Sequence, residues 1–317
     1  MKAWLPVSYS SAVKDKPISV KLLGEHLVIW RDKGSVRCLL DLCIHRGVAL
    51  SLGSICDGNI VCPYHGWRYR GDGKCTLIPQ LEDQCKIPPK AKIKSYKVQE
   101  KFGIVWVAVD EPLYDLPDIP EFSDSSWRAV ETGPFPWKAN SARQVENFTD
   151  FAHFPFVHPE LLGDPERPFV PPHTVTRKDN ILYYEIIRPE ASNTEEFPIF
   201  GNPNQEKPMR HNRYQLILPY TIFLRVGWPG SSNGMIYFFT SQPVSENECI
   251  GYCVILKNYG EDYSETLKKF EDLIFSQDQI IVESQRPEQV PYDLSEELHL
   301  KFDAVAVAYR KAMGESY

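Results

Sequence analysis

The distribution of apolar and polar residues differs between the two halves of the chain. In the first half, short apolar runs at residues 26–30, 36–40 and 103–109 are separated by Gly, Asp and Lys. Runs of this kind, rich in β-branched and aromatic residues and bounded by turn residues, are typical of strands. The first half is therefore predicted to form a small antiparallel β domain.

The second half mixes strand-like runs with helical periodicity. Strands are predicted at residues 181–187, 220–226, 235–240 and 251–256. Helices are predicted over 264–285, where apolar residues recur at steps of three, four and seven, and over 295–313. The polar, proline-bearing segment 190–213 is predicted to be a loop. The expected fold class is α+β, in which an antiparallel sheet flanked by helices follows the N-terminal antiparallel β domain.

The boundary between the domains is predicted from a change in composition. Residues 110–127 are acidic and rich in proline, with Pro112, Pro117 and Pro120 in close succession, which is typical of a linker. A length of 317 residues favours two domains. We therefore expect one domain over residues 1–120 and another over residues 121–317.

Composition and charge narrow the class of protein. Hydrophobic residues make up 43% and charged residues 24% of the chain, a balance typical of soluble globular proteins. The net charge of −7 and the lack of basic runs argue against a nucleic-acid partner. The sequence contains no run of about 18 apolar residues, the length needed to span a membrane. The N-terminus does not resemble a signal peptide. A cytoplasmic location is expected, where cysteines such as Cys38 and Cys253 remain reduced core residues.

Two mixed cysteine–histidine pairs carry the strongest chemical signal. Cys43 and His45 are spaced C-x-H, and Cys62 and His65 are spaced C-x-x-H. A [2Fe–2S] cluster with two Cys on one iron and two His on the other requires this set of ligands. The alternative is a structural zinc site, but zinc sites usually pair like residues within each arm. The pattern favours the cluster and therefore the transfer of single electrons.

A second group of metal-ligating residues lies in the middle of the chain. If residues 142–153 are helical, Asp150 and His153 share one face of the helix. Pro155 is then expected to end or kink that helix, so that His158 turns back toward His153. Two imidazoles beside a carboxylate favour mononuclear non-haem Fe(II) that binds O₂. The alternative is a pair of hydrogen-bonded core histidines.

The third iron ligand is predicted from the helix over 264–285. Asp278 falls within the apolar arc of this helix, where a buried carboxylate is unfavourable unless a cation or hydrogen bonds compensate it. Glu271 lies at the edge of the same arc and is the competing candidate. Asp272 and Glu283 are predicted to face solvent. For Asn147, a capping amide and a role in the iron site both remain open.

Together these motifs resemble those of the Rieske non-haem iron oxygenases over nearly the whole chain. The resemblance implies that Cys43, His45, Cys62 and His65 hold the cluster and that His153, His158 and Asp278 hold the mononuclear iron. It also implies a head-to-tail homotrimer, in which Asp150 connects the cluster of one subunit to the iron of the next through His65 and His153. A ferredoxin or flavin reductase would pass NAD(P)H electrons to the cluster.

Within the family, the short chain is similar to the monooxygenases of the vanillate O-demethylase type. Segments 46–51, 67–69 and 283–288 look similar to cyanobacterial hydroxylases that modify the alkaloid saxitoxin. The expected reaction is the hydroxylation or oxidative demethylation of a small molecule, which the resemblance suggests is an alkaloid of the saxitoxin type. A ring-hydroxylating dioxygenase that forms a cis-dihydrodiol is the enzymatic alternative. A Rieske electron carrier is the non-enzymatic one.

Overall fold

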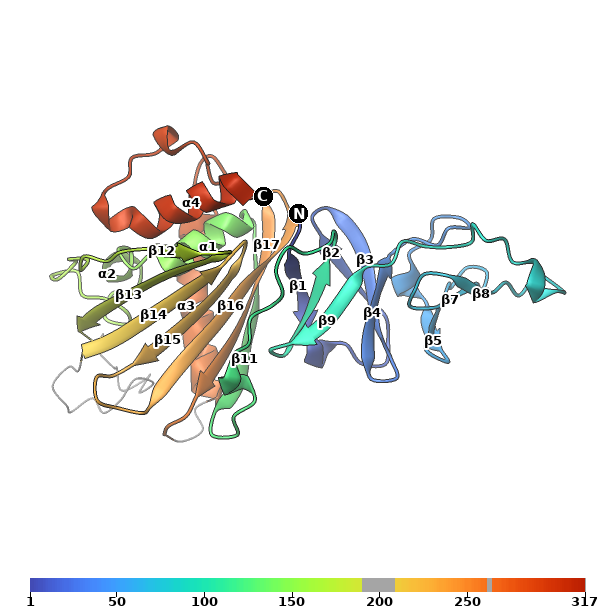
Figure 1. Ribbon diagram of the computed structural model, residues 1–317, viewed down its shortest axis with the longest axis horizontal. Coiled ribbons are helices and arrows are strands. Elements are labelled where there is room, and N and C mark those ends of the chain that lie inside the picture. Colours follow the sequence, from blue (N-terminus) through green and yellow to red (C-terminus); the bar gives the residue numbers. More distant parts are fainter. Residues whose placement is uncertain (190–208, 261–263, 317) are drawn as a thin grey trace. The chain divides into compact units, whose positions relative to one another are not determined.

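The structure is a computed structural model that describes residues 1–189, 209–260 and 264–316. The chain divides into two compact units, Met1–Leu116 and Pro117–Tyr317 (Figure 1). The boundary therefore lies four residues before the predicted one at residue 120. It falls within the proline-rich segment, where few side chains pack into either core.

The first unit is built from three small antiparallel sheets, with strand orders β1-β10-β9, β2-β3-β4 and β5-β6-β7-β8. The strands are β1 (Trp4–Tyr9), β2 (Ile18–Leu22), β3 (Glu25–Asp32), β4 (Ser35–Leu40), β5 (Ser54–Cys56), β6 (Asn59–Val61), β7 (Arg68–Tyr69), β8 (Cys75–Leu77), β9 (Lys97–Lys101) and β10 (Ile104–Ala108). The predicted antiparallel β domain is confirmed. Its core includes Trp30, Leu39, Ile60 and Tyr69, all fully buried.

The second unit contains one seven-stranded antiparallel sheet in the order β11-β17-β16-β15-β14-β13-β12. The strands are β11 (Arg128–Trp137), β12 (Thr176–Lys178), β13 (Ile181–Pro189), β14 (Met209–Ile217), β15 (Thr221–Gly227), β16 (Gly234–Ser245) and β17 (Glu248–Lys257). The helices are α1 (Ser141–Thr149), α2 (Phe154–Val157), α3 (Ser264–Val282) and α4 (Ala304–Ser316). The sheet and its helices confirm the predicted α+β class.

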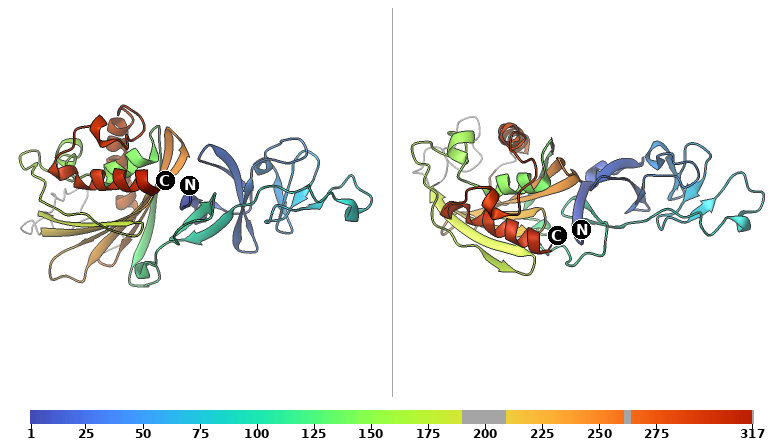
Figure 2. Two further views of the ribbon diagram at one scale, coloured as in Figure 1. Left: turned by 45° about the horizontal axis from the view of Figure 1, so that its top comes forward. Right: turned by 90° about the horizontal axis from the view of Figure 1, so that it is seen from above.

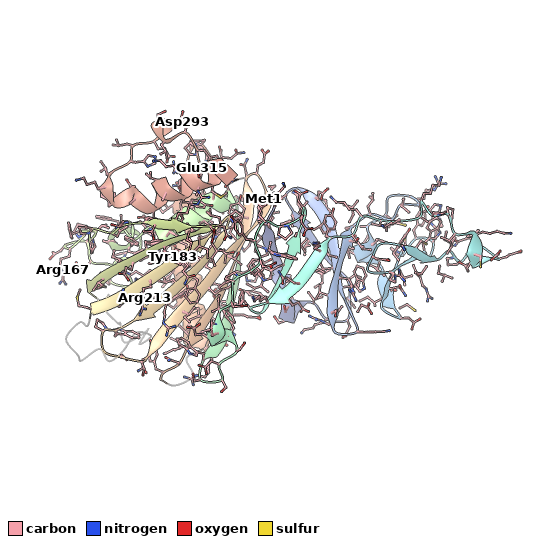
Figure 3. All side chains as sticks on the ribbon, viewed as in Figure 1. Met1, Arg167, Tyr183, Arg213, Asp293 and Glu315 are labelled. Atoms are coloured by element: carbon pink, nitrogen blue, oxygen red, sulfur yellow. The ribbon has the colours of Figure 1, made fainter. Side chains whose placement is uncertain are left out.

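Helices α1 and α3 pack on the same face of this sheet, and α4 contacts α1 and β13 (Figures 1 and 2). Side chains on β13 and β14 alternate between the two faces of the sheet. Tyr184 and Tyr214 are buried on the face that the helices cover. Tyr183 and Arg213, labelled in Figure 3, belong to the opposite face and are more exposed. The candidate catalytic residues therefore lie between the sheet and α1, α2 and α3.

Two element predictions in the second unit were wrong. Residues 295–313 do not form one helix, because two short 3-10 turns (Leu294–Glu296 and Lys301–Asp303) precede α4. The Asp303 carboxylate accepts the Leu300 N–H at 2.7 Å and so caps the start of the second turn. Within the predicted loop 190–213, residues 209–213 form the start of β14, while 190–208 lie outside the described residues.

The remaining global predictions concern cysteines and membranes. All eight cysteines are free thiols, and Cys38 and Cys253 are buried core residues as predicted. In the described ranges, no helix is both long and apolar enough to cross a membrane.

Candidate metal centres

The two cysteine–histidine arms lie on loops of the first unit that converge on one point. Residues 43–48 belong to the connection between β4 and β5, and residues 62–67 join β6 to β7. The Cys43 and Cys62 side chains are both buried, and the neighbouring Cys43 thiol contributes to raising the pKa of Cys62, after the larger effect of burial. The rings of His45 and His65 meet edge to face, with their centroids 4.5 Å apart. The sequence pattern therefore brings all four predicted cluster ligands together.

Each arm closes through the same backbone turn. The N–H of Gly47 donates to the Cys43 carbonyl at 2.8 Å, and the N–H of Gly66 donates to the Cys62 carbonyl at 3.0 Å. Both glycines have positive φ angles, +71° and +73°, which a residue with a Cβ adopts only with strain. The tight turns allow each thiol and its neighbouring imidazole to face the same point.

The donor set of the arms fits a [2Fe–2S] cluster. Nδ1 of both His45 and His65 is buried without a hydrogen-bond partner, as expected of atoms that ligate a metal. The hydroxyl of Tyr69 lies 3.2 Å from the Cys43 sulfur. Trp67 stacks on His45 with a centroid distance of 4.6 Å and so fixes the ring orientation. Such hydrogen-bonding and packing neighbours tune cluster potential.

Cys62→Ser is expected to abolish the visible absorption and EPR signal of the cluster. The reason is that a serine oxygen does not replace a buried thiolate on iron. Cys85→Ser is the matched control, because Cys85 is exposed and outside the arms. Absorption and EPR spectra of both purified variants check the result. An unchanged spectrum in Cys62→Ser would show that Cys62 is not a ligand.

The second candidate centre consists of His153, His158 and Asp278. One ligand atom from each of these residues lies within 4.8 Å of the other two. Oδ1 of Asp278 is 2.9 Å from Nε2 of His158 and 3.4 Å from Nε2 of His153. Both Nε2 atoms are buried and make no hydrogen bond of acceptable geometry. The group fits a metal in a 2-His-1-carboxylate arrangement.

The backbone around Asp150 differs from the predicted helix over 142–153. Helix α1 ends at Thr149, and Asp150 is extended, with φ −84° and ψ 132°. Pro155 neither ends nor kinks that helix, because it lies in the first turn of the separate helix α2. A proline is well accommodated there, since the N–H groups of a first turn have no partner within the helix.

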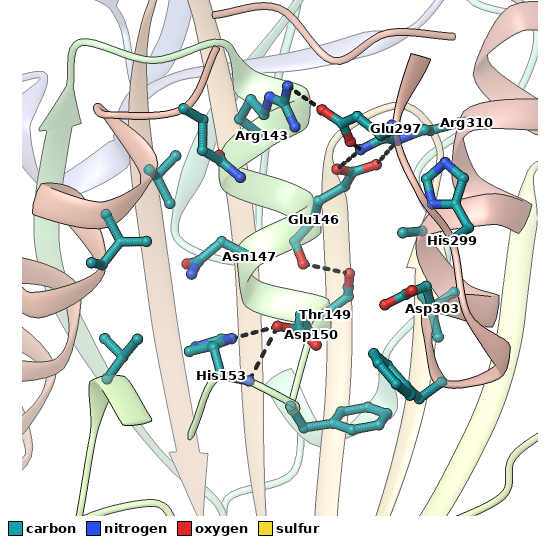
Figure 4. A pocket seen from close by; sticks show the side chains of 18 of the residues that line it. Arg143, Glu146, Asn147, Thr149, Asp150, His153, Glu297, His299, Asp303 and Arg310 are labelled. Carbon is teal, nitrogen blue, oxygen red and sulfur yellow. Dashed lines mark hydrogen bonds and ion pairs between the residues drawn. The ribbon is translucent and has the colours of Figure 1, made fainter. Parts of the chain in front are cut away.

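Asp150 still reaches His153, but through a local turn. Its carboxylate accepts the N–H of Ala152 at 2.9 Å and contacts Nδ1 of the His153 ring at 2.8 Å (Figure 4). Burial lowers the pKa of His153, but the carboxylates of Asp150 and Asp278 more than offset this and raise it to about 9. The same two carboxylates would also stabilise a cation bound at this site. Asp150 is thus placed to orient His153 with Nε2 toward Asp278.

Helix α3 supplies Asp278 rather than Glu271 to the group. Burial raises the pKa of Asp278, but the adjacent His153 and His158 outweigh it and hold the pKa below its usual value. Glu271 is buried two turns earlier on the same helix and does not join the group. Asp272 is exposed as predicted. Glu283 is only partly exposed, and it accepts the N–H of Lys138 at 2.8 Å.

Two further residues contact the group. Nδ2 of Asn147 donates to Oδ1 of Asp278 at 3.2 Å. The sequence left open whether Asn147 caps a helix or belongs to the iron site, and this hydrogen bond places its side chain at the site. Oε1 of Gln277 lies 2.7 Å from Nδ1 of His158 and fixes that ring with Nε2 toward Asp278. Sequence reasoning missed Gln277, because no local pattern pairs it with His158, which is 119 positions away.

Gln277→Leu is expected to weaken mononuclear iron binding by about 10–100-fold, because His158 loses the acceptor that fixes its ring. Gln279→Leu is a matched control on the same helix, since Gln279 donates to Glu283 and to the Pro136 carbonyl instead. Titration of the apoprotein with Fe(II) measures both affinities. Equal affinities in the two variants would contradict the orienting role.

A cavity of about 350 Å³ opens beside Asp150 and His153 (Figure 4). Its lining includes a largely buried ion cluster of Arg143, Glu146, Glu297 and Arg310. Arg310 on α4 binds Glu146 on α1 through two contacts of 2.6 and 2.8 Å. The cluster therefore anchors the helix that precedes Asp150 to the last helix of the chain.

A second cavity of about 70 Å³ also borders the metal group. Its lining includes His153 and Asp278 together with aromatic side chains, among them Phe148, Phe275 and Tyr237. A largely apolar cavity that reaches the candidate metal ligands is the expected place for a substrate.

Comparison with protein families matches both units. Residues 3–97 match the Rieske [2Fe-2S] domain, and residues 137–316 match the vanillate O-demethylase oxygenase C-terminal domain. Methylxanthine N1-demethylase NdmA of Pseudomonas putida is 34% identical over 94% of this chain and 82% of its own length. Methylxanthine N3-demethylase NdmB of the same organism is 32% identical over 93% of this chain and 81% of its own.

Comparison with solved structures agrees with these family and sequence matches. NdmA of Pseudomonas putida CBB5 with caffeine has a TM-score of 0.87 at 30% identity, covering 98% of this chain and 89% of that one. Dicamba monooxygenase bound to dicamba has a TM-score of 0.85 at 22% identity, covering 99% and 96%, which shows the shared fold.

The fold, the two groups of ligands and these relatives define the class: the chain belongs to the Rieske non-haem iron oxygenases. Within that class it belongs to the branch of vanillate O-demethylase, and it is a monooxygenase that hydroxylates or oxidatively demethylates a small molecule. The alternative of a Rieske electron carrier is set aside, because residues 137–316 match an oxygenase domain.

Proposed function

We propose that this enzyme oxidises a small nitrogen-containing molecule, by hydroxylation or by removal of a methyl group, at a mononuclear Fe(II) held by His153, His158 and Asp278. The observation that carries the proposal is the convergence of these three side chains beside a largely apolar cavity that His153 and Asp278 line. The methylxanthine demethylases among its relatives support a nitrogen-containing substrate. A saxitoxin-type alkaloid stays a sequence-based prediction.

The bound iron would supply the activation of O₂. The residues around it then have defined tasks. Asp150 and Gln277 orient the two imidazoles, and Asn147 donates a hydrogen bond to Asp278. The aromatic lining excludes water and holds the substrate. Oxidation of an N- or O-methyl group consumes one O₂, two electrons and two protons and yields a hydroxymethyl group and water. The hydroxymethyl group then leaves as formaldehyde.

Electron supply is the second part of the proposal. A ferredoxin or flavin reductase would deliver NAD(P)H electrons to the cluster. In a cytoplasmic homotrimer, Asp150 would accept a hydrogen bond from His65 of the neighbouring subunit while it holds His153. Two observations support this arrangement: the Asp150 carboxylate is 42% exposed, and the apolar side chains of Ile44 and Tyr64 beside the cluster histidines are exposed.

Product analysis tests the proposed reaction. The purified enzyme would be combined with a reductase, NADH and O₂ and offered N-methylated and unmethylated nitrogen heterocycles. We expect either a product that carries one oxygen atom from ¹⁸O₂ or release of formaldehyde in proportion to the NADH consumed. A cis-dihydrodiol as the main product would instead establish the dioxygenase alternative. Cluster reduction without any oxygenated product, and with no mononuclear iron, would contradict the proposal.

A further inference from the structure

Charge is divided unevenly between the two halves of the chain. Residues 1–116 contain 17 Lys and Arg but 12 Asp and Glu, whereas residues 117–317 contain 18 Lys and Arg but 30 Asp and Glu. The unit with the cluster ligands is therefore basic, although the whole chain has a net charge of −7. An excess of positive charge on one unit attracts acidic partners to it.

Three exposed lysines lie close together in this basic unit, beside β8. Lys74 and Lys92 are directly opposite each other in an antiparallel bridge, and the N–H of Lys92 donates to the Lys90 carbonyl at 2.8 Å. Like charges in opposite positions destabilise such a pairing. Asp72 pairs with Arg70 instead, and among the described residues no ion pair compensates the three lysines. Lys74, Lys90 and Lys92 are called the lysine patch below.

The lysine patch lies next to the predicted cluster cysteines. Two residues that directly follow patch lysines, Cys75 and Ile93, pack in the same core as Cys43. Cys75 is also paired with Tyr69 across β7 and β8, and the Tyr69 hydroxyl lies 3.2 Å from the Cys43 sulfur. A short path of packed side chains therefore connects the patch to the cysteine side of the cluster site.

The patch is separate from the histidine side of the cluster site. The second arm, residues 62–67, immediately precedes β7, whereas the turn that leads to Lys74 follows β7. The arm and the patch thus lie at opposite ends of this strand. The proposed contact with a neighbouring subunit involves His65 in the arm. A protein bound at the patch would leave that histidine free.

We propose that the lysine patch is the docking surface for an acidic electron donor of the ferredoxin type. One electron passes from the reduced donor to the oxidised cluster, and no covalent bond forms or breaks. Electrons then enter on the cysteine side of the cluster and leave through its histidines. Opposite charges speed the encounter of the two proteins. The proposal rests on the proposed function, because it names where the electron donor of that reaction binds.

Stopped-flow reduction of the cluster tests this docking surface. The probe is a reduced plant-type [2Fe–2S] ferredoxin, which is acidic and has a lower potential than Rieske clusters. The absorption change of the cluster gives the rate constant. We expect it to fall at least about tenfold between about 20 and 500 mM NaCl, because salt screens the attraction. A rate that does not depend on salt would overturn the proposal.

The test variant is Lys74→Glu/Lys92→Glu, which should slow reduction by ferredoxin about tenfold at low salt. Lys14→Glu/Lys16→Glu is the matched control, because it changes the charge equally at two exposed lysines before β2. Reduced riboflavin, which is small and neutral, should reduce the cluster equally fast in every variant. Calorimetry with oxidised ferredoxin should show weaker binding in the test variant alone. If that variant does not assemble its cluster, Lys90→Glu takes its place.

Each other outcome has a defined meaning. A wild-type rate with ferredoxin in the test variant would refute the docking surface, and an equal loss of rate in the control variant would do the same. A lower oligomeric mass of the test variant in analytical ultracentrifugation would mean that the patch meets the acidic half of a second copy. The proposed function fails separately, if the wild-type enzyme lacks mononuclear iron or forms no oxygenated product, because reduction of the cluster by ferredoxin does not require that iron.

Discussion

Asp278→Ala is expected to lower the iron content by about one atom per chain and to abolish turnover, while the cluster spectrum is retained. The carboxylate is the only acidic group within reach of both imidazole Nε2 atoms in the described chain, at 2.9 and 3.4 Å. Without it, two histidines remain in a buried site, and they bind Fe(II) weakly. Iron analysis together with absorption spectroscopy measures both centres in one sample.

Glu271→Ala is the control for this result, because it removes a buried carboxyl group from the same helix and the same cavity. It should keep mononuclear iron. The opposite outcome, iron loss in Glu271→Ala and retention in Asp278→Ala, would show that the competing carboxylate is the ligand.

Asp150→Asn is expected to keep both metal centres and slow electron transfer between them by about 100-fold. The amide oxygen of the asparagine still accepts the Ala152 N–H that holds the local turn. The negative charge of the carboxylate, which stabilises the contact with Nδ1 of His153, is lost. In a trimer, the variant would also weaken the connection to the neighbouring His65. The test is a single turnover: the cluster is reduced, substrate and O₂ are added, and cluster reoxidation is followed by its absorption.

Asp303→Asn is the matched control for Asp150→Asn. Asp303 lines the same cavity, and an asparagine there removes the same charge but still caps the Leu300 N–H. Reoxidation at the wild-type rate in Asp150→Asn would refute the bridging role. Loss of mononuclear iron from the variant would assign Asp150 to the orientation of His153 alone.

The sequence was most informative where the chemistry depends on short-range spacing or on the period of a helix. The cluster arms could be predicted because each pairs a cysteine and a histidine within one turn. Asp278 could be predicted because a carboxylate within an apolar arc requires compensation. Both signals depend only on neighbours along one segment.

The errors arose where contacts between segments decide the structure. The polar residues Arg210 and Asn212 made β14 look like a loop, because its buried face is polar and lines a cavity. Asp150 was assigned to a helix, although its side chain bonds to the backbone two residues later and so favours a turn. The contact between Gln277 and His158 joins residues that are 119 positions apart, which no local pattern reveals.

The buried ion cluster has a consequence for the order in which the protein is assembled during synthesis. Arg310 pairs with Glu146 and Glu297, so the helix before Asp150 gains its anchor only after the last helix has emerged from the ribosome. All four cluster ligands, in contrast, lie within Met1–Leu116, a unit with its own core. A nascent chain therefore completes the unit that would receive its iron–sulfur cluster about two hundred residues before the helix that precedes Asp150 gains its anchor.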